Sequence, residues 1–81
     1  MTRSSKPIKV LIVDDSALFR RLFSRALAHL DGIEVVGSAN GAAEAREFIA
    51  RRRPDVIALD VEMPHEDGLT FLKRQMAEDP I

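Results

Sequence analysis

The chain has 81 residues, of which 46% are hydrophobic and 31% charged, and this composition is typical of one small globular domain. Its formal net charge of -1 argues against bulk electrostatic binding to nucleic acid or to a membrane surface, and the absence of cysteine excludes disulfides and thiol chemistry. No apolar stretch approaches the length of a membrane span or resembles the core of a signal peptide, so the sequence predicts a cytoplasmic protein.

The chain opens with a short tail, a strand and a helix. Residues 1–7 are polar, which predicts a disordered N-terminus. Residues 8–13, IKVLIV, form a nearly continuous apolar run, which is typical of a strand covered on both faces. Over residues 16–30 the apolar side chains recur at helical spacing, and Arg20 and Arg21 fall on the remaining, polar face.

Two further strand–helix pairs follow. Residues 33–39 predict a more exposed strand and 42–53 a second helix, while 56–60 predict an apolar strand and 69–77 a third helix. The residues expected to face inward are Ala45, Phe48 and Ile49 on the second helix and Leu69, Leu72 and Met76 on the third. The order βαβαβα with short loops predicts an α/β fold of three layers, with a parallel sheet in the order 2-1-3.

Carboxylates follow two strands that this order makes neighbours. Asp14 and Asp15 come after the first strand, and Asp60 ends the third. Ligands of such sheets bind outside the carboxyl ends of the strands, so we expect these side chains to meet there. Two carboxylates about 4 Å apart repel by roughly 4 kcal/mol at an effective dielectric of 20, and a raised pKa or a bound cation relieves that repulsion. An all-oxygen site of this kind suits Mg²⁺.

The same residues suggest a covalent step. Asp60 is the best candidate for a nucleophile toward phosphorus, which would give an aspartyl phosphate, because it ends its strand in the crevice. Asp15 would be the main metal ligand and Asp14 an outer or water-mediated one. Two simpler interpretations compete: Asp14 or Asp15 could cap the first helix, and Asp60 could be an ordinary polar residue at a strand end. The meeting of all three on adjacent strands favours function.

Two stretches carry a family resemblance. VLIVDDSALFRR (10–21) and PDVIALDVEMPHEDG (54–68) resemble the receiver domain of bacterial two-component response regulators, through the paired aspartates, the D-x-x-M-P turn and the following D-G. Within that family they look most like the N-terminal regulatory domain of the chemotaxis protein-glutamate methylesterase. The resemblance covers residues 8–81 and implies a flavodoxin-like fold, incomplete because the fourth and fifth strands, with their Ser or Thr and their Lys, have no counterpart here. Since these residues belong to the site in the family, we expect phosphorylation of the isolated chain to be impaired.

The resemblance also implies roles for single residues. Asp60 matches the residue that a sensor histidine kinase phosphorylates. Mg²⁺ would be held by Asp15, Asp60 and the backbone carbonyl of Glu62, with Asp14 acting through water. The surface that meets the kinase would lie on the first turns of the first helix, at Ala17, Leu18, Arg20 and Arg21. This domain would not itself be an enzyme; in the parent protein it would control an attached C-terminal effector, a methylesterase or another domain.

Three further expectations remain open. The third strand would be an edge strand with apolar neighbours, which favours self-association of the chain. A degenerate or truncated receiver that serves only as a protein-interaction module is one alternative function. A Mg²⁺-dependent phosphohydrolase with an aspartate nucleophile is another, although Glu62 is a loose match to the second acid of such enzymes and the chain has no room for a substrate-covering segment.

Overall fold

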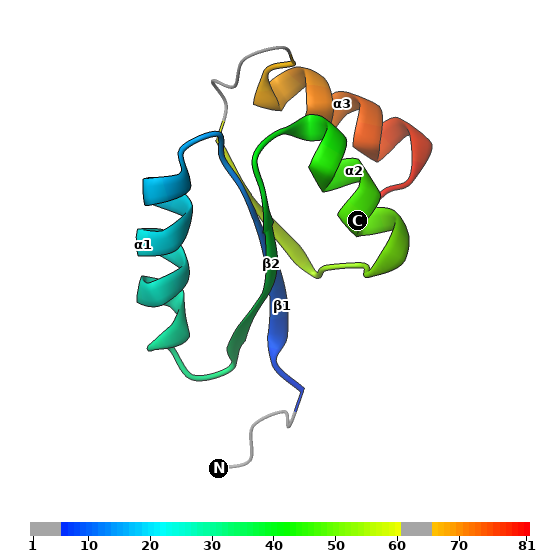
Figure 1. Ribbon diagram of the computed structural model, residues 1–81. Coiled ribbons are helices and arrows are strands. Elements are labelled where there is room, and N and C mark those ends of the chain that lie inside the picture. The colour runs from blue at the N-terminus through cyan, green and yellow to red at the C-terminus, as the bar shows by residue number, and fades with distance from the viewer. Residues whose placement is uncertain (1–5, 61–65) are drawn as a thin grey trace.

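The computed structural model describes residues 6–60 and 66–81, in which strands and helices alternate. The strands are β1 (Ile8–Val13), β2 (Ile33–Ala39) and β3 (Val56–Leu59), and the helices are α1 (Ala17–Ala28), α2 (Ala42–Arg51) and α3 (Gly68–Glu78). All strands are parallel and follow the predicted order β2-β1-β3. In Figure 1, α1 covers one face of the sheet while α2 and α3 cover the other, which confirms the three predicted layers.

The ends of the elements differ from the predictions by one or two residues. Ser16 is the N-cap of α1, where its hydroxyl accepts the Phe19 amide at 3.1 Å, so the helix proper begins one residue later than predicted. The second helix ends at Arg51 and not at Arg53, because Pro54 disfavours a helical conformation in the residue before it. The predicted disordered tail falls, for residues 1–5, outside the described residues.

The core lies between the sheet and the α2–α3 layer, with β1 at its centre. The buried members of this core are Leu11, Val13, Ala39, Ala42, Ala45, Ile49 and Phe71. Val10 and Ile12, on the opposite face of β1, are buried as well, as predicted for a strand covered on both sides. Where β2 passes beneath α2, a Cβ at Gly37 would lie 2.3 Å from the ring of Phe48, so only glycine fits without displacing that ring.

The inward face of α3 is not the predicted one. Leu69 and Met76 are 54% and 44% exposed, whereas Phe71 is fully buried and Gln75 is 6% exposed. The helix is turned so that Phe71, its largest apolar side chain, fills the core, while the predicted Leu72 is partly buried. The Gln75 amide can be buried beside it since it donates to the Asp79 carbonyl at 2.7 Å.

Polar contacts hold both ends of α3. At its start, the Thr70 amide donates to the Asp67 carboxylate at 2.8 Å, and this hydrogen bond holds the pKa of Asp67 below its ordinary value. At its end, the Arg53 guanidinium donates to Asp79 at 2.7 Å and to the carbonyl of Pro80; the first contact lowers the pKa of Asp79 and raises that of Arg53. Carboxylates with lowered pKa values stabilise the fold above about pH 4 and lose that contribution as the pH falls further.

Apolar surface remains on the side of the sheet that α1 covers. None of the α1 side chains is fully buried, and Leu18, Phe19 and Leu22 are 64%, 48% and 53% exposed. In the part of the chain that the structure describes, β3 pairs with β1 alone, and Val56 at its start is 45% exposed. Within the same ranges, no helix has the length and apolar character needed to cross a membrane.

Candidate metal centre

The register of β1 against β3 brings Asp14 beside Asp60. Val13 pairs with Leu59, which makes the next residue of each strand neighbours. The Asp60 amide donates to the Val13 carbonyl at 2.9 Å, and the Asp14 amide donates to the Ala39 carbonyl of β2 at 3.0 Å. The backbone ladder therefore continues up to the residues that carry the carboxylates. Their positions are fixed by the sheet and not by a loop alone.

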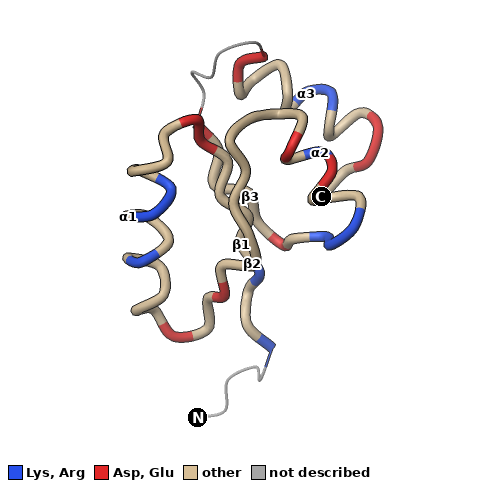
Figure 2. Tube along the Cα trace, in the orientation of Figure 1, with Lys and Arg blue, Asp and Glu red and all other residues tan. Residues whose placement is uncertain are grey.

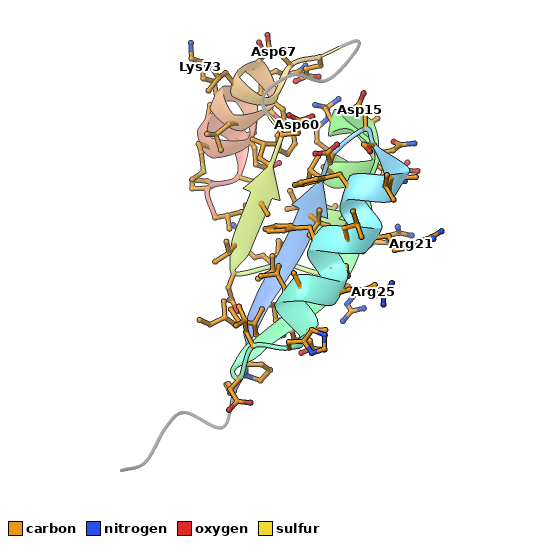
Figure 3. The ribbon with its side chains drawn as sticks, turned by 90° about the vertical axis from the view of Figure 1, so that its left-hand side faces the viewer. Asp15, Arg21, Arg25, Asp60, Asp67 and Lys73 are labelled. Atoms are coloured by element: carbon orange, nitrogen blue, oxygen red, sulfur yellow. The ribbon has the colours of Figure 1, made fainter. Side chains whose placement is uncertain are left out.

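Asp14, Asp15 and Asp60 form one cluster, as the sequence predicted. One carboxylate oxygen from each lies within 4.8 Å of the others. Asp14 is 8% exposed, Asp60 is partly buried and Asp15 is exposed. Figure 3 shows Asp15 and Asp60 at the same end of the sheet, and Figure 2 shows acidic residues where the chain passes from β1 to α1. Carboxylates this close repel one another strongly, so the site favours a bound cation.

The helix-cap interpretation of the paired aspartates is wrong. Ser16 occupies the N-cap of α1, so neither Asp14 nor Asp15 does. Asp14 instead accepts the Ser16 amide at 2.8 Å through Oδ1, in a local turn of the kind that aspartate favours. This turn holds the Asp14 side chain at the carboxyl end of β1. Because Ser16 caps the helix, the side chains of Asp14 and Asp15 remain part of the carboxylate cluster.

Arg20 makes a contact that the sequence did not predict. Its Nη1 donates to the backbone carbonyl of Asp14 at 2.7 Å, and its side chain is partly buried. Arg21 is exposed and projects from the side of α1 in Figure 3. Ala17 and Leu18 are exposed on the same helix. Of the four residues predicted to meet a kinase, Arg20 alone is bonded to the turn that carries the paired aspartates.

Two hollows open beside the cluster. One, of about 400 Å³, lies between α1 and β3, and its lining residues are Val13, Asp14, Phe19, Phe23, Ala58, Leu59 and Asp60. Its aromatic wall is ordered, because the rings of Phe19 and Phe23 stack with centroids 5.5 Å apart. The other, of about 480 Å³, lies on the α2 side, and its lining residues are Asp15, Asn40, Gly41, Ala42, Ala43, Arg46 and Glu66. The cluster is thus reached from both sides of the sheet.

Glu66 connects the site to the α2–α3 layer. Its Oε1 lies 3.1 Å from Arg46 on α2 and 3.6 Å from Arg74 on α3, and its side chain is 16% exposed. Its Oε2 is buried and has no hydrogen-bond partner within the described residues. These ion pairs fix the chain shortly before α3. Glu62, whose backbone carbonyl was predicted to be a metal ligand, lies outside the described residues.

The donor set fits Mg²⁺ by its chemistry. All three members of the cluster offer carboxylate oxygens, which are the hard ligands that this ion prefers. Mg²⁺ usually keeps several of its waters in proteins, and the exposure of Asp15 leaves room for them. Among residues 6–60 and 66–81, the cluster has neither nitrogen nor sulfur ligands, and such a donor set suits a hard cation better than the softer transition metals.

Comparisons with known proteins agree with this arrangement. The family model described as response regulator receiver domain matches residues 10–80. Protein-glutamate methylesterase/protein-glutamine glutaminase 5 of Anaeromyxobacter dehalogenans is 53% identical over 78 residues, which are 96% of this chain and 22% of that protein. The chain therefore spans about a fifth of the length of this curated relative.

Solved structures share the fold. The response regulator domain of Thermotoga maritima CheB superposes with a TM-score of 0.85 at 39% identity, over 93% of this chain and 56% of that one. A chain of the CheX–CheY–BeF3–Mg²⁺ complex from Borrelia burgdorferi superposes with a TM-score of 0.79 at 30% identity, over 91% of this chain and 56% of that one. Each of the two superpositions covers more than nine tenths of this chain.

Proposed function

Because this chain belongs to the response regulator receiver domain family, we propose that it accepts a phosphoryl group from a sensor histidine kinase on Asp60, with Mg²⁺ bound beside it. The observation that carries the proposal is the meeting of Asp14, Asp15 and Asp60 within 4.8 Å at the end of β1 and β3. The similar chain of the Borrelia burgdorferi complex, which contains Mg²⁺ and BeF3, supports it. In this function the domain is a phosphoacceptor and not an enzyme.

The transfer is a nucleophilic substitution at phosphorus. A carboxylate oxygen of Asp60 forms a bond to phosphorus while the bond between phosphorus and the donor's imidazole nitrogen breaks, and the electron pair of that bond leaves with the imidazole. The strand ladder holds Asp60 at the edge of the crevice, so its oxygen is oriented before the donor arrives. Mg²⁺, when bound, neutralises negative charge on the phosphoryl oxygens and on the carboxylates.

The metal would be held by residues from both strands. Asp15 and Asp60 would be direct ligands, and the buried Asp14 would act through water. The backbone carbonyl of Glu62 completes the proposed ligand set. In this arrangement Asp60 would serve both as a metal ligand and as the phosphoryl acceptor.

The relatives suggest what the phosphoryl group controls. The Anaeromyxobacter dehalogenans relative is a protein-glutamate methylesterase of which this chain spans 22%. We propose that this chain is the regulatory part of a chemotaxis phosphorelay and controls an effector domain of that kind in its parent protein, in the cytoplasm. The kinase would bind the first turns of α1, where the proposed contact residues are Ala17, Leu18, Arg20 and Arg21.

One assay separates this function from its alternatives. The chain is incubated with Mg²⁺ and acetyl phosphate, and both its intact mass and the released phosphate are measured. A phosphoacceptor gains one phosphoryl group per chain. Catalytic phosphate release without an accumulating adduct would indicate a phosphohydrolase, and an unmodified chain would indicate an interaction module.

The exposed edge of β3 leads to a further proposal, that the isolated chain self-associates there. Within the described residues β3 has β1 as its one neighbour, and Val56 at its start is 45% exposed. Antiparallel pairing of two such edges would place the two copies of Asp60 at opposite ends of the contact, so their charges would not oppose it. We expect dimers of the wild-type chain in sedimentation velocity at tens of micromolar protein.

A charge at this edge tests the contact. Val56→Lys is expected to shift the chain to a monomer, because a lysine at an edge strand opposes pairing. Leu30→Lys introduces the same charge at a residue that is 53% exposed and distant from β3 in the sequence, and should leave the dimer intact. A wild-type chain that sediments as a monomer throughout this range contradicts the proposal.

A further inference from the structure

Arg20 lies in the first turn of α1, and its partly buried side chain reaches back to the turn that joins β1 to α1. We infer that Arg20 is a positioning residue for the metal site. Its side chain holds the peptide between Asp14 and Asp15 in place, and this inference rests on the proposed function. The guanidinium would act through the backbone and would not touch the metal or the phosphoryl group. The contact with the Asp14 carbonyl is made by Arg20, and its neighbour Arg21 is exposed and is not assigned a positioning role.

The backbone hydrogen bonds around this turn explain why the Arg20 side chain is the group that bonds the Asp14 carbonyl. The backbone amide of Arg20 donates to the Ser16 carbonyl at 3.0 Å, which starts the α1 ladder, and the Phe19 amide is satisfied by the Ser16 hydroxyl. The Asp14 carbonyl lies before this ladder, where it receives the Arg20 Nη1 at 2.7 Å. This distance is typical of a hydrogen bond from a charged donor, which is stronger than one between neutral groups.

Fixing the Asp14 carbonyl also fixes Asp15. The carbonyl of one residue and the amide of the next belong to a single planar unit, so a hydrogen bond that sets the direction of the former sets that of the latter. The Asp15 side chain starts from the far end of that unit. Mg²⁺ tolerates little departure from octahedral geometry, and a ligand must therefore be held closely. Arg20 supplies the restraint from the helix side of the turn.

Electrostatics alone predicts the opposite effect. A guanidinium bonded to the Asp14 carbonyl adds a positive charge beside the cluster and weakens its attraction for a divalent cation, so removing that charge should tighten Mg²⁺ binding. If Arg20 positions the ligands, its removal should weaken binding instead. The sign of the change therefore distinguishes positioning from simple charge. Arg21, one residue away and exposed, is the matched control for the loss of one positive charge.

Calorimetric titration with MgCl₂ tests the inference on four chains: the wild type, Arg20→Gln, Arg21→Gln and Arg20→Lys. We expect Arg20→Gln to raise the Kd about tenfold, the lower end of the effects seen when groups that orient metal ligands are removed. Arg21→Gln should stay within about twofold of the wild type, since exposed charges act weakly. Arg20→Lys should recover most of the affinity, because one charged N–H donor makes the contact. Equal or tighter binding by Arg20→Gln than by Arg21→Gln would overturn the inference.

A second measurement does not need the metal. The Ser16 amide is bonded to the Asp14 side chain at 2.8 Å, so its hydrogen exchange reports whether the turn is held. In metal-free protein we expect exchange at Ser16 to be about tenfold faster in Arg20→Gln than in Arg21→Gln, because a charge-assisted hydrogen bond has been lost. Equal exchange in both variants contradicts positioning. If the wild type binds no Mg²⁺ but this difference is still seen, the metal site is refuted, and Arg20 holds the turn without positioning a metal ligand.

Discussion

Asp60→Asn is expected to abolish phosphorylation of the chain by acetyl phosphate in the presence of Mg²⁺. Asparagine keeps the shape of the side chain, so β3 and its contact with β1 should persist. Its amide offers no anionic oxygen to attack phosphorus, and the cluster loses one of its three negative charges. Loss of a nucleophile typically lowers a rate by at least about a thousandfold. Intact-mass measurement over time, at matched protein concentration, would record this loss.

Asp55→Asn provides the control for this experiment. Asp55 lies just before β3, at the end of the strand away from the cluster, where its carboxylate accepts the Lys9 amide at 2.9 Å. The substitution removes the same charge from the same stretch of chain without touching the proposed acceptor. We expect this variant to gain one phosphoryl group at the wild-type rate. Phosphorylation of Asp60→Asn at that rate would contradict the assignment of Asp60.

Phe71→Ala is expected to lower the free energy of unfolding by about 3–5 kcal/mol. The Phe71 ring is fully buried in the core between the sheet and α2, and its removal leaves a cavity that the short helix α3 cannot close. A chain of this size buries only about 60% of the surface that its unfolded form exposes, a smaller share than in larger domains, so its total stability is low and a loss of this size would unfold much of the protein. Urea denaturation followed by circular dichroism measures the difference.

Leu69→Ala tests the assignment of the inward face on the same helix. Leu69 is 54% exposed, so shortening it should change the free energy of unfolding by no more than about 1 kcal/mol. The sequence predicted the reverse, with Leu69 inward. If Leu69→Ala were as destabilising as Phe71→Ala, the orientation of α3 described above would be wrong.

The strands and the acidic cluster were predictable because few physical rules decide them. Ile8–Val13 and Ile33–Ala39 are strands over the predicted residues: the first is a nearly continuous apolar run, and the second is rich in β-branched residues at its start. Polar or turn-forming residues flank both. The alternation of strands with helices gives parallel pairing, and parallel pairing brings strand ends together. The approach of Asp60 to Asp14 follows from those rules, before any side chain is placed.

The remaining features depend on packing in three dimensions. Apolar residues are spread around α3, and whether Phe71 or Leu69 faces inward depends on the shape of the core that receives it. The contact from Arg20 to the Asp14 carbonyl joins a side chain to a backbone group outside its own helix. The spacing of residues in the sequence does not predict a contact of this kind. The N-cap of α1 could have been predicted from the sequence, because serine, here Ser16, is a favoured N-cap residue.

The central claim is that Asp14, Asp15 and Asp60 form a metal-dependent phosphoacceptor site, and one measurement tests it directly. The wild-type chain is incubated with acetyl phosphate in two portions, one with MgCl₂ and one with a chelator in excess, and the intact mass of each is followed. We predict that a singly phosphorylated form of the chain accumulates with Mg²⁺, at a reduced level because the isolated chain is expected to be impaired, and that none accumulates with the chelator. No adduct in either portion, or the same adduct in both, would contradict the claim.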